Sequence, residues 1–349
     1  MEALVLLVAF VVILAGAELF TNGIEWFGHK LELAEGAVGS VLAAVGTALP
    51  ETMIPLIAIL FSAGHAASDV GVGAILGAPF MLATLAMFVT GAAVLVAGRS
   101  RPTGDVMVVD PPVIAHDMRW FVVSYGLAVG VAFLPAELSW PRLAVAAVLV
   151  GLYGYYVLEH LRAEAAHGEP DLAPLRMHRL DRRAPAHPAP PRLRIVSFQV
   201  LVALGLIIVG AYAFVGAVSG LATELGLSEV LLALVIAPIA TELPEKFNSI
   251  IWVRQGKDTL AMGNITGAMV FQSAIPTVIA LVFAPDRWAV TPDSLIAFGS
   301  AGIALLSSAA IFLPMARSGR LQGRRLLIGG VFYLVYLGLV VGRLAGISI

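Results

Sequence analysis

Two stretches decide the fold of this chain: Gly46-Thr47-Ala48-Leu49-Pro50-Glu51 and Ala240-Thr241-Glu242-Leu243-Pro244-Glu245. Each places a Pro-Glu pair inside a long apolar segment. Proline within a helix removes a backbone hydrogen bond and bends the helix. An acid at the centre of a membrane-spanning helix costs about 2.5 to 3.5 kcal/mol on insertion scales, so it usually marks a functional site. The repetition of the pair indicates such a site rather than a chance kink.

The composition around these motifs is that of a membrane protein. Of 349 residues, 59% are hydrophobic and 13% are charged, whereas soluble domains carry about 25% charged residues. Apolar runs long enough to cross a bilayer, which takes about 20 residues, alternate with short polar segments. The sequence therefore predicts an all-α integral membrane protein with about ten transmembrane helices, over 2–22, 37–62, 70–98, 119–136, 141–161, 194–221, 228–253, 259–284, 291–314 and 325–347.

The chain also contains an internal repeat. Gly16-Ala17 matches Gly210-Ala211 at the same offset of 194 residues that relates the two Pro-Glu motifs. We expect a first five-helix repeat over 1–161, a cytoplasmic linker loop over 162–193 and a second five-helix repeat over 194–349. Because five spans is an odd number, the second repeat begins on the opposite side and is inverted, as is typical of secondary transporters.

The distribution of basic residues predicts the orientation. Most Lys and Arg residues fall in loops on one side, whereas Arg142, Arg287 and Arg343 fall on the other. The positive-inside rule places the central loop in the cytoplasm and both termini outside, and we expect a bacterial-type plasma membrane. The net charge of −2 does not favour nucleic acid as a partner, and the absence of cysteine excludes thiolate metal sites. Five tryptophans at span ends are expected to be interfacial anchors: Trp26, Trp120, Trp140, Trp252 and Trp288.

The residue types in the two motifs suit a hard cation. Each proline frees the carbonyl four residues earlier, and Ca²⁺ takes six to eight oxygen ligands at about 2.3–2.6 Å. The predicted oxygen ligands are the carbonyls of Gly46 and Ala240, the hydroxyls of Thr47 and Thr241, and the carboxylates of Glu51 and Glu245. The alternative is a structural kink in which a protonated glutamate bonds to a neighbour.

Further polar residues lie close to the second motif. Glu242 and Lys246 are four residues apart and can touch on one helix. Glu242 is therefore either a third acid of the site or half of a neutralising ion pair. Asn264 and Gln272 lie in the following span and add neutral oxygens.

These motifs resemble the alpha-repeats of the cation/Ca²⁺ antiporter superfamily, the sodium/calcium exchangers. Those repeats carry Gly-Thr-Ser-x-Pro-Glu followed by Gly-Asn-x-x-Gly-Ser, and the second elements here are Gly73-Ala74-Ile75-Leu76-Gly77-Ala78 and Gly263-Asn264-Ile265-Thr266-Gly267-Ala268. The resemblance implies ten helices in inverted halves, with central Glu and Thr ligands for Ca²⁺ and flanking sites for Na⁺. The chain departs from the pattern at Na⁺-type positions, which are Ala48, Ala78, Glu242, Ala268, Leu82 and Gln272.

We therefore expect a secondary antiporter, not an enzyme, that moves a divalent cation, Ca²⁺ by resemblance, against Na⁺ or H⁺. It needs no cofactor besides the transported cations, and its expected partners are membrane lipid and inorganic cations. A passive cation channel on the same scaffold is one alternative. A degenerate family member with a structural or sensory role is another, suggested by the apolar replacements. The sequence leaves the oligomeric state open.

Overall fold

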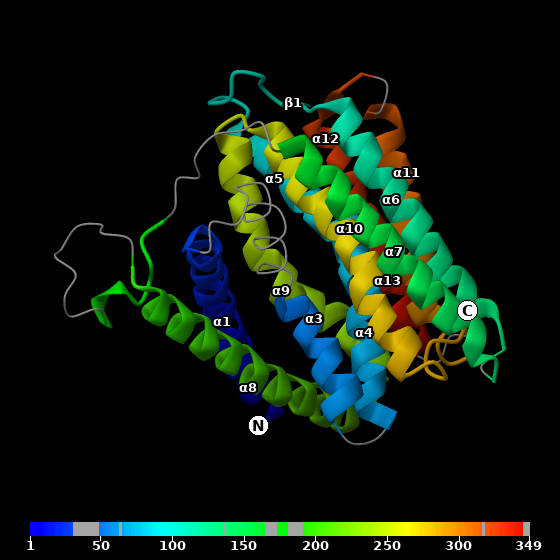
Figure 1. Cartoon of the computed structure of the whole chain (residues 1–349). Helices are drawn as coiled ribbons and strands as arrows, with labels where there is room; N and C mark the ends of the chain where they lie inside the picture. Colours follow the sequence, from blue (N-terminus) through cyan, green and yellow to red (C-terminus); the bar gives the residue numbers. More distant parts are fainter. Residues whose placement is uncertain are drawn as a thin grey trace.

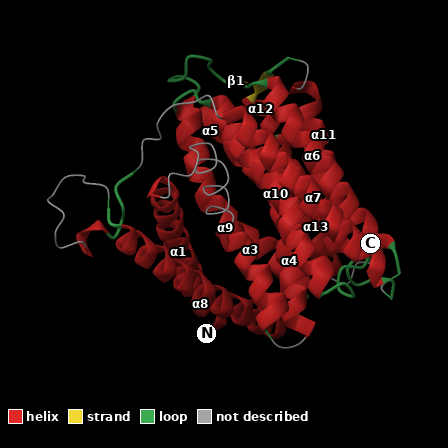
Figure 2. Cartoon of the chain, viewed as in Figure 1, coloured by secondary structure: helices red, strands yellow, loops and turns green. Residues whose placement is uncertain are grey.

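The computed structural model describes residues 1–30, 49–62, 65–135, 137–164, 173–180, 191–315 and 318–344, and these are helical almost throughout (Figures 1 and 2). The α-helices are α1 (Glu2–Lys30), α3 (Leu49–Leu56), α4 (His65–Met81), α5 (Met87–Ala97), α6 (Pro111–Gly130), α7 (Ser139–Glu164), α8 (Leu193–Leu225), α9 (Glu229–Arg254), α10 (Asp258–Phe283), α11 (Leu295–Met315), α12 (Gly323–Leu326) and α13 (Ile328–Leu344). Two π-helical turns, Ile57–Phe61 and Leu82–Ala86, extend α3 and join α4 to α5.

Seven helical segments in the described part of the chain are long and apolar enough to cross a membrane. They are Glu2–Ile24, Ala67–Ala97, Ser139–Glu159, Leu193–Leu225, Ala261–Phe283, Leu295–Met315 and Gly323–Gly342. The expectation of a mostly helical integral membrane protein is therefore confirmed. The spans expected over 119–136 and 228–253 correspond to α6 and α9, and the described end of the span expected over 37–62 corresponds to α3.

Helix α6 extends beyond the start of the span expected over 119–136, because the helix begins at Pro111. Proline at the first helical position loses no helical hydrogen bond and has a backbone angle suited to a helix. The first turns of α6 carry His116, Asp117 and Arg119, which an apolar pattern excludes from a span. This correction moves Asp117 from a loop into a helix.

A short sheet, which the all-helical expectation did not include, joins the two halves of the sequence. Strand β1 (Val106–Val108) pairs antiparallel with β2 (Arg320–Gln322), and Met107 lies opposite Leu321. The loop after α5 is thereby attached to the loop before α12 (Figure 1). Both central side chains, Met107 and Leu321, are fully buried, so the sheet caps the apolar core at this end of the bundle.

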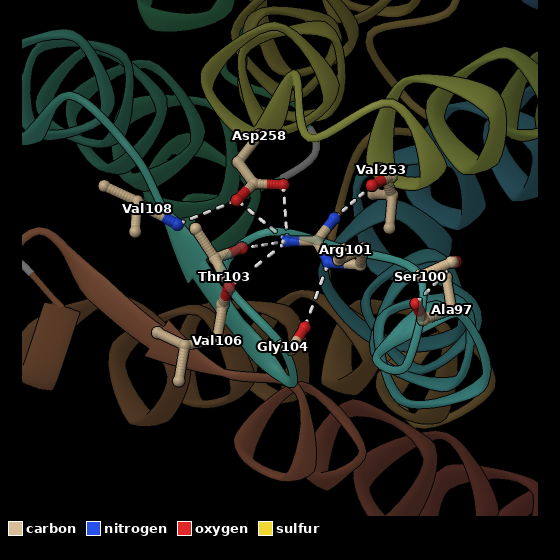
Figure 3. A network of polar contacts seen from close by, with 9 residues as sticks. All are labelled: Ala97, Ser100, Arg101, Thr103, Gly104, Val106, Val108, Val253 and Asp258. Atoms are coloured by element: carbon tan, nitrogen blue, oxygen red, sulfur yellow. Dashed lines mark hydrogen bonds and ion pairs between the residues drawn. The ribbon is translucent and has the colours of Figure 1, made fainter.

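A buried ion pair lies beside this sheet (Figure 3). The guanidinium of Arg101 donates to both carboxylate oxygens of Asp258 at 2.9 Å and to the carbonyl oxygen of Val253. The backbone N–H of Val108 also donates to Asp258, at 2.8 Å. Arg101 follows α5, Val253 lies near the end of α9, and Asp258 begins α10. One side chain therefore fixes the junction between α9 and α10 to the end of α5 and to β1.

Helix α4 packs against α9 at two glycines. A Cβ atom added at Gly73 would overlap with the carbonyl oxygen of Val230, and one added at Gly77 would overlap with that of Leu234. Small residues allow such close backbone approach between membrane helices, where packing replaces the hydrophobic effect as the source of association. The two helices are thus held at a separation that only glycine permits at these positions.

Helices α1 and α8 lie side by side along one flank of the bundle and run antiparallel (Figure 1). Their closest contacts are reciprocal. A Cβ at Gly16 would lie 2.8 Å from Ile207 Cγ1, and a Cβ at Gly210 would lie 2.7 Å from Ile13 Cγ1. Each pair of equivalent positions is separated by the 194-residue offset of the sequence repeat.

Two further features differ in their burial from the sequence pattern. Trp140 is 71% exposed, as an interfacial anchor would be, but Trp288 is fully buried and donates to the Ala128 carbonyl at 2.7 Å. Its assignment as an anchor is therefore wrong.

Part of the 162–193 segment contacts the helices: Asn22 of α1 accepts from the backbone N–H of Arg176 at 2.9 Å, and Leu175 is 2% exposed.

The glycine contacts predict a directional effect on stability. We expect Gly77→Ala to lower stability by about 1–3 kcal/mol through overpacking against α9. Gly151→Ala is the matched control, because Gly151 is exposed on α7 with nothing within 4 Å of the added Cβ. The measurement is the thermal unfolding midpoint of each purified variant in detergent. Equal midpoints for Gly77→Ala and Gly151→Ala would contradict the close packing.

The buried ion pair predicts an asymmetry between single and double substitutions. Asp258→Asn leaves the Arg101 charge buried without its counter-charge and is expected to cost about 3–5 kcal/mol, whereas the double change Arg101→Met with Asp258→Leu recovers part of this loss. The control is Glu18→Gln, since the Glu18–Arg176 pair is exposed and worth at most about 1 kcal/mol. Thermal unfolding again gives the comparison, and a harmless Asp258→Asn would refute the assigned role.

Candidate ion-binding site

Glu51 is a buried carboxylate at the centre of several packed helices. It lies in the first turn of α3, is 6% exposed, and both of its carboxylate oxygens are inaccessible to solvent. Helix α3 packs against α4, α8, α9 and α10. The sequence prediction of an acid inside the helical bundle is met at this position. Burying an ionised acid in such surroundings costs free energy unless the acid neutralises a cation or accepts hydrogen bonds.

The other residues of the two motifs are only partly visible. Ala240, Thr241, Glu242 and Glu245 lie within the continuous helix α9, but their side chains are outside the described part of the structure. Gly46 and Thr47 are also outside the described residues. Their predicted place around a cation therefore stays a prediction.

Asn264 is positioned by a residue that the sequence analysis missed. Its side-chain amide donates to the hydroxyl of Ser249 at 3.2 Å, and Ser249 is fully buried in α9. Ser249 lies one helical turn after position 245, within the same helix as the second Pro-Glu motif. The hydrogen bond thus ties the Gly-Asn segment of α10 to the helix that carries the second motif. A hydroxyl four residues after an intramembrane acid was the signal available in the sequence.

The deeper part of α10 supplies buried neutral groups. Gln272 is 2% exposed, and Ser273 is fully buried with its hydroxyl donating to Val270 O at 2.9 Å. The corresponding part of α4 is apolar, with Ala78, Leu82 and Ala83 all buried. It continues into the π-helical turn Leu82–Ala86, a deviation often found at functional sites. Gln272 and Ser273 are thus buried polar residues of α10, whereas the matching positions of the first half, Leu82 and Ala83, are apolar.

Asp117 is a second buried acid, and the sequence analysis did not single it out. It is 1% exposed in α6 and accepts hydrogen bonds from Tyr156 of α7, at 3.0 Å, and from the Thr266 hydroxyl of α10. Because the expected span began at 119, this acid was assigned to a loop. Proline at 111 as a helix start was the signal that would have included it.

Comparisons with known proteins identify the family of this chain. The sodium/calcium exchanger protein family matches residues 1–160 and 196–344. The relative named "Putative antiporter CaxA", of Alkalimonas amylolytica, is 27% identical over 330 residues, covering 94% of this chain and 95% of that protein. Inner membrane protein YrbG of Escherichia coli is 25% identical over 250 residues, covering 72% of this chain and 70% of its own length.

Solved structures share the fold. The crystal structure of the H⁺/Ca²⁺ exchanger CAX matches with a TM-score of 0.71 at 15% identity, covering 96% of this chain and 81% of that one. The sodium-calcium exchanger NCX_Mj matches with a TM-score of 0.57 at 16% identity, covering 97% of this chain and 98% of that one. The family match extends over both halves of the sequence and includes the buried Glu51. This chain therefore belongs to the sodium/calcium exchanger protein family, which consists of secondary transporters rather than enzymes.

Proposed function

We propose that this protein is a secondary antiporter that exchanges a divalent cation, Ca²⁺, for H⁺ or Na⁺. The observation that carries the proposal is the buried carboxylate of Glu51 in α3, a helix that packs against α1, α4, α8, α9 and α10. Such an acid suits a transported cation, which neutralises it when bound. Family membership supports the same function, and two structural relatives are an H⁺/Ca²⁺ exchanger and a sodium-calcium exchanger.

The proposed architecture has about ten spans in two inverted halves, 1–161 and 194–349, joined by a cytoplasmic loop over 162–193. The antiparallel pair α1 and α8 supports it, because Gly16 and Gly210 make equivalent contacts in opposite directions. Inverted repeats bring equivalent broken helices together at the bilayer midplane. The termini are then outside the cell.

In this proposal Glu51 and Glu245 are the primary ligands of the cation, and Glu242 is a third acid. The remaining ligands are neutral oxygens from the backbone of Gly46 and Ala240 and from the side chains of Thr47, Thr241, Asn264 and Gln272. Ca²⁺ requires about six to eight oxygens, which this set can supply. The cations are substrates, and the lipid bilayer is the other partner.

A proton is the counter-ion that the residues favour. A sodium site needs several neutral oxygens, but Ala78 and Leu82, at two of the Na⁺-type positions, are buried apolar residues. A proton needs only a carboxylate that can exchange it, and the acids of the two motifs qualify. Gln272 is a buried neutral group that could serve a reduced sodium site.

We predict that Glu51→Gln and Glu245→Gln each abolish divalent-cation transport while the protein stays folded, since each change removes a charge and keeps the shape. The measurement is Ca²⁺ uptake into proteoliposomes, with folding checked by thermal unfolding. Glu224→Gln is the control, because Glu224 is exposed at the end of α8. Native uptake by both site variants would exclude these glutamates as ligands.

The counter-ion is tested in the same proteoliposomes with H⁺ and Na⁺ gradients imposed independently. We expect Ca²⁺ efflux to follow the pH gradient in the absence of Na⁺ and to lose this dependence in Glu242→Gln. Efflux that requires Na⁺ and ignores pH would establish sodium coupling. Downhill Ca²⁺ flux with neither counter-ion would favour a channel, and absence of any cation binding would favour a structural or sensory role.

A further inference from the structure

The Asp117 carboxylate lies outside the candidate cation site but contacts the same helix. Its Oδ2 accepts from the Thr266 hydroxyl of α10, and its Oδ1 accepts from the Tyr156 hydroxyl of α7 at 3.0 Å. Asp117, Thr266 and Tyr156 are all buried. An acid inside a membrane helix is costly to insert and usually has a functional partner. The arrangement therefore places a second embedded carboxylate on the flank of α10 that faces α6.

The two flanks of α10 have different partners. Asn264 and Thr266 are two residues apart, which corresponds to about 200° around a helix, so their side chains leave on opposite sides. Asn264 donates to Ser249 of α9, and Thr266 donates to Asp117 of α6. Helix α10 thus connects the candidate cation site on one side with Asp117 on the other.

The hydrogen bonds around Thr266 can exist in two arrangements. An ionised Asp117 only accepts, so the Thr266 hydroxyl donates to it. A protonated Asp117 has a hydrogen to donate, and a threonine hydroxyl can both accept one bond and donate another. The Thr266 oxygen lies 3.5 Å from the carbonyl oxygen of Gly263. When Asp117 gains a proton, the hydroxyl can therefore turn from Asp117 to Gly263, the residue before Asn264.

A route for the proton lies on the partly exposed face of α6, beside His116. The Nε2 atom of His116 lies 2.8 Å from Glu159 Oε2, and its Nδ1 atom lies 3.9 Å from Asp117 Oδ1. The side chains of His116 and Glu159 are 34% and 35% exposed. They line a cavity of about 250 Å³ with Arg119, Trp120 and Val123. An imidazole can accept a proton at one nitrogen and release another from the second, so His116 connects this cavity to Asp117.

Other titratable groups on the neighbouring helices have separate partners or are absent. Helices α7, α10 and α11 pack against α6. On α10 the acid Asp258 is held by Arg101, and α11 (Leu295–Met315) contains no titratable residue. On α7 the described groups that face this region are Tyr153, Tyr155, Tyr156 and Glu159: Tyr156 donates to Asp117, Tyr155 bonds to Glu159, and Tyr153 lies beside Tyr156. Among the described residues, His116, Asp117 and Glu159 form this path.

We propose that Asp117 is a proton-exchange site, loaded from the His116–Glu159 cavity, whose protonation is transmitted to α10 through the Thr266 hydroxyl. A proton from water binds His116 Nε2, the Nδ1 proton passes to Asp117 Oδ1, and the imidazole is left neutral with its hydrogen on Nε2. Rotation of the protonated Asp117 carboxyl group then turns its O–H towards Thr266, which accepts this bond, and the Thr266 hydroxyl donates to Gly263 O. The effect on transport rests on the proposed antiport function, whereas the protonation of Asp117 does not.

Infrared difference spectroscopy tests the protonation directly. Full-length protein in lipid vesicles without divalent cations is stepped from neutral to acidic pH, and the carboxylic acid C=O band of a buried acid is recorded. We expect Asp117→Asn to lose one such band. Thr266→Val should keep the band at a shifted frequency, because one hydrogen bond is lost. Thr266→Ser should leave it unchanged. Identical spectra for the native protein and Asp117→Asn would refute the proposal.

Transport tests the coupling in the same vesicles. The pH is varied on the side of the membrane that the His116–Glu159 cavity faces. We expect the native Ca²⁺ efflux rate to change by up to about tenfold per pH unit, which is the limit for a single titrating group. Asp117→Asn and Thr266→Val should both reduce this dependence to less than about twofold, whereas Thr266→Ser should retain it. A native pH profile in folded Asp117→Asn or Thr266→Val would refute the coupling. If the native protein moved no cation, the proposed function would fail while the infrared result still decided the state of Asp117.

Discussion

The close contact of α4 with α9 at Gly73 and Gly77 is the constraint on which the rest of this structure depends. Helices in lipid gain little from the hydrophobic effect when they associate, because the tails are as apolar as the side chains. Association then requires near contact of backbones, which only the smallest residues allow. Here the glycines bring α4 against Val230 and Leu234. Helix α3, with the buried Glu51, packs against both of these helices and is enclosed together with α10.

Two buried arginines of this protein donate hydrogen bonds to backbone carbonyls at helix ends and turns. Arg142 is fully buried and donates to the carbonyls of Leu134, Pro135 and Leu138 and to that of Trp288. Arg101 likewise donates to the Val253 carbonyl near the end of α9 and to the carboxylate of Asp258. Helix ends leave carbonyl groups without helical partners, and in lipid each one needs another donor. Buried arginines therefore stabilise the turns of this bundle.

Helix α10 links these elements, since it contacts α9 through Asn264, α6 through Thr266 and the β1 loop through Asp258. A shift of α10 would change all three contacts. The equivalent segment of the sequence repeat differs, because α4 is apolar near Ala78 and gives way to a π-helical turn at Leu82–Ala86, whereas α10 runs unbroken from Asp258 to Phe283. The two segments related by the sequence repeat therefore differ in both polarity and helix geometry. The proposed cation site is correspondingly asymmetric.

The sequence by itself determined the membrane class, the helical segments, the internal repeat and the family, because apolar length and the paired Pro-Glu motifs are local properties of the chain. It also identified Glu51, since an acid inside an apolar run is conspicuous. Only the tertiary structure decided that Asp117 is buried, that Ser249 holds Asn264, and that Trp288 and Arg142 lie inside. The burial of Asp117, Ser249, Trp288 and Arg142 depends on which helices pack together and on where α6 begins. Helix packing joins residues more than a hundred positions apart, such as Asp117 and Thr266, and no local pattern encodes that contact.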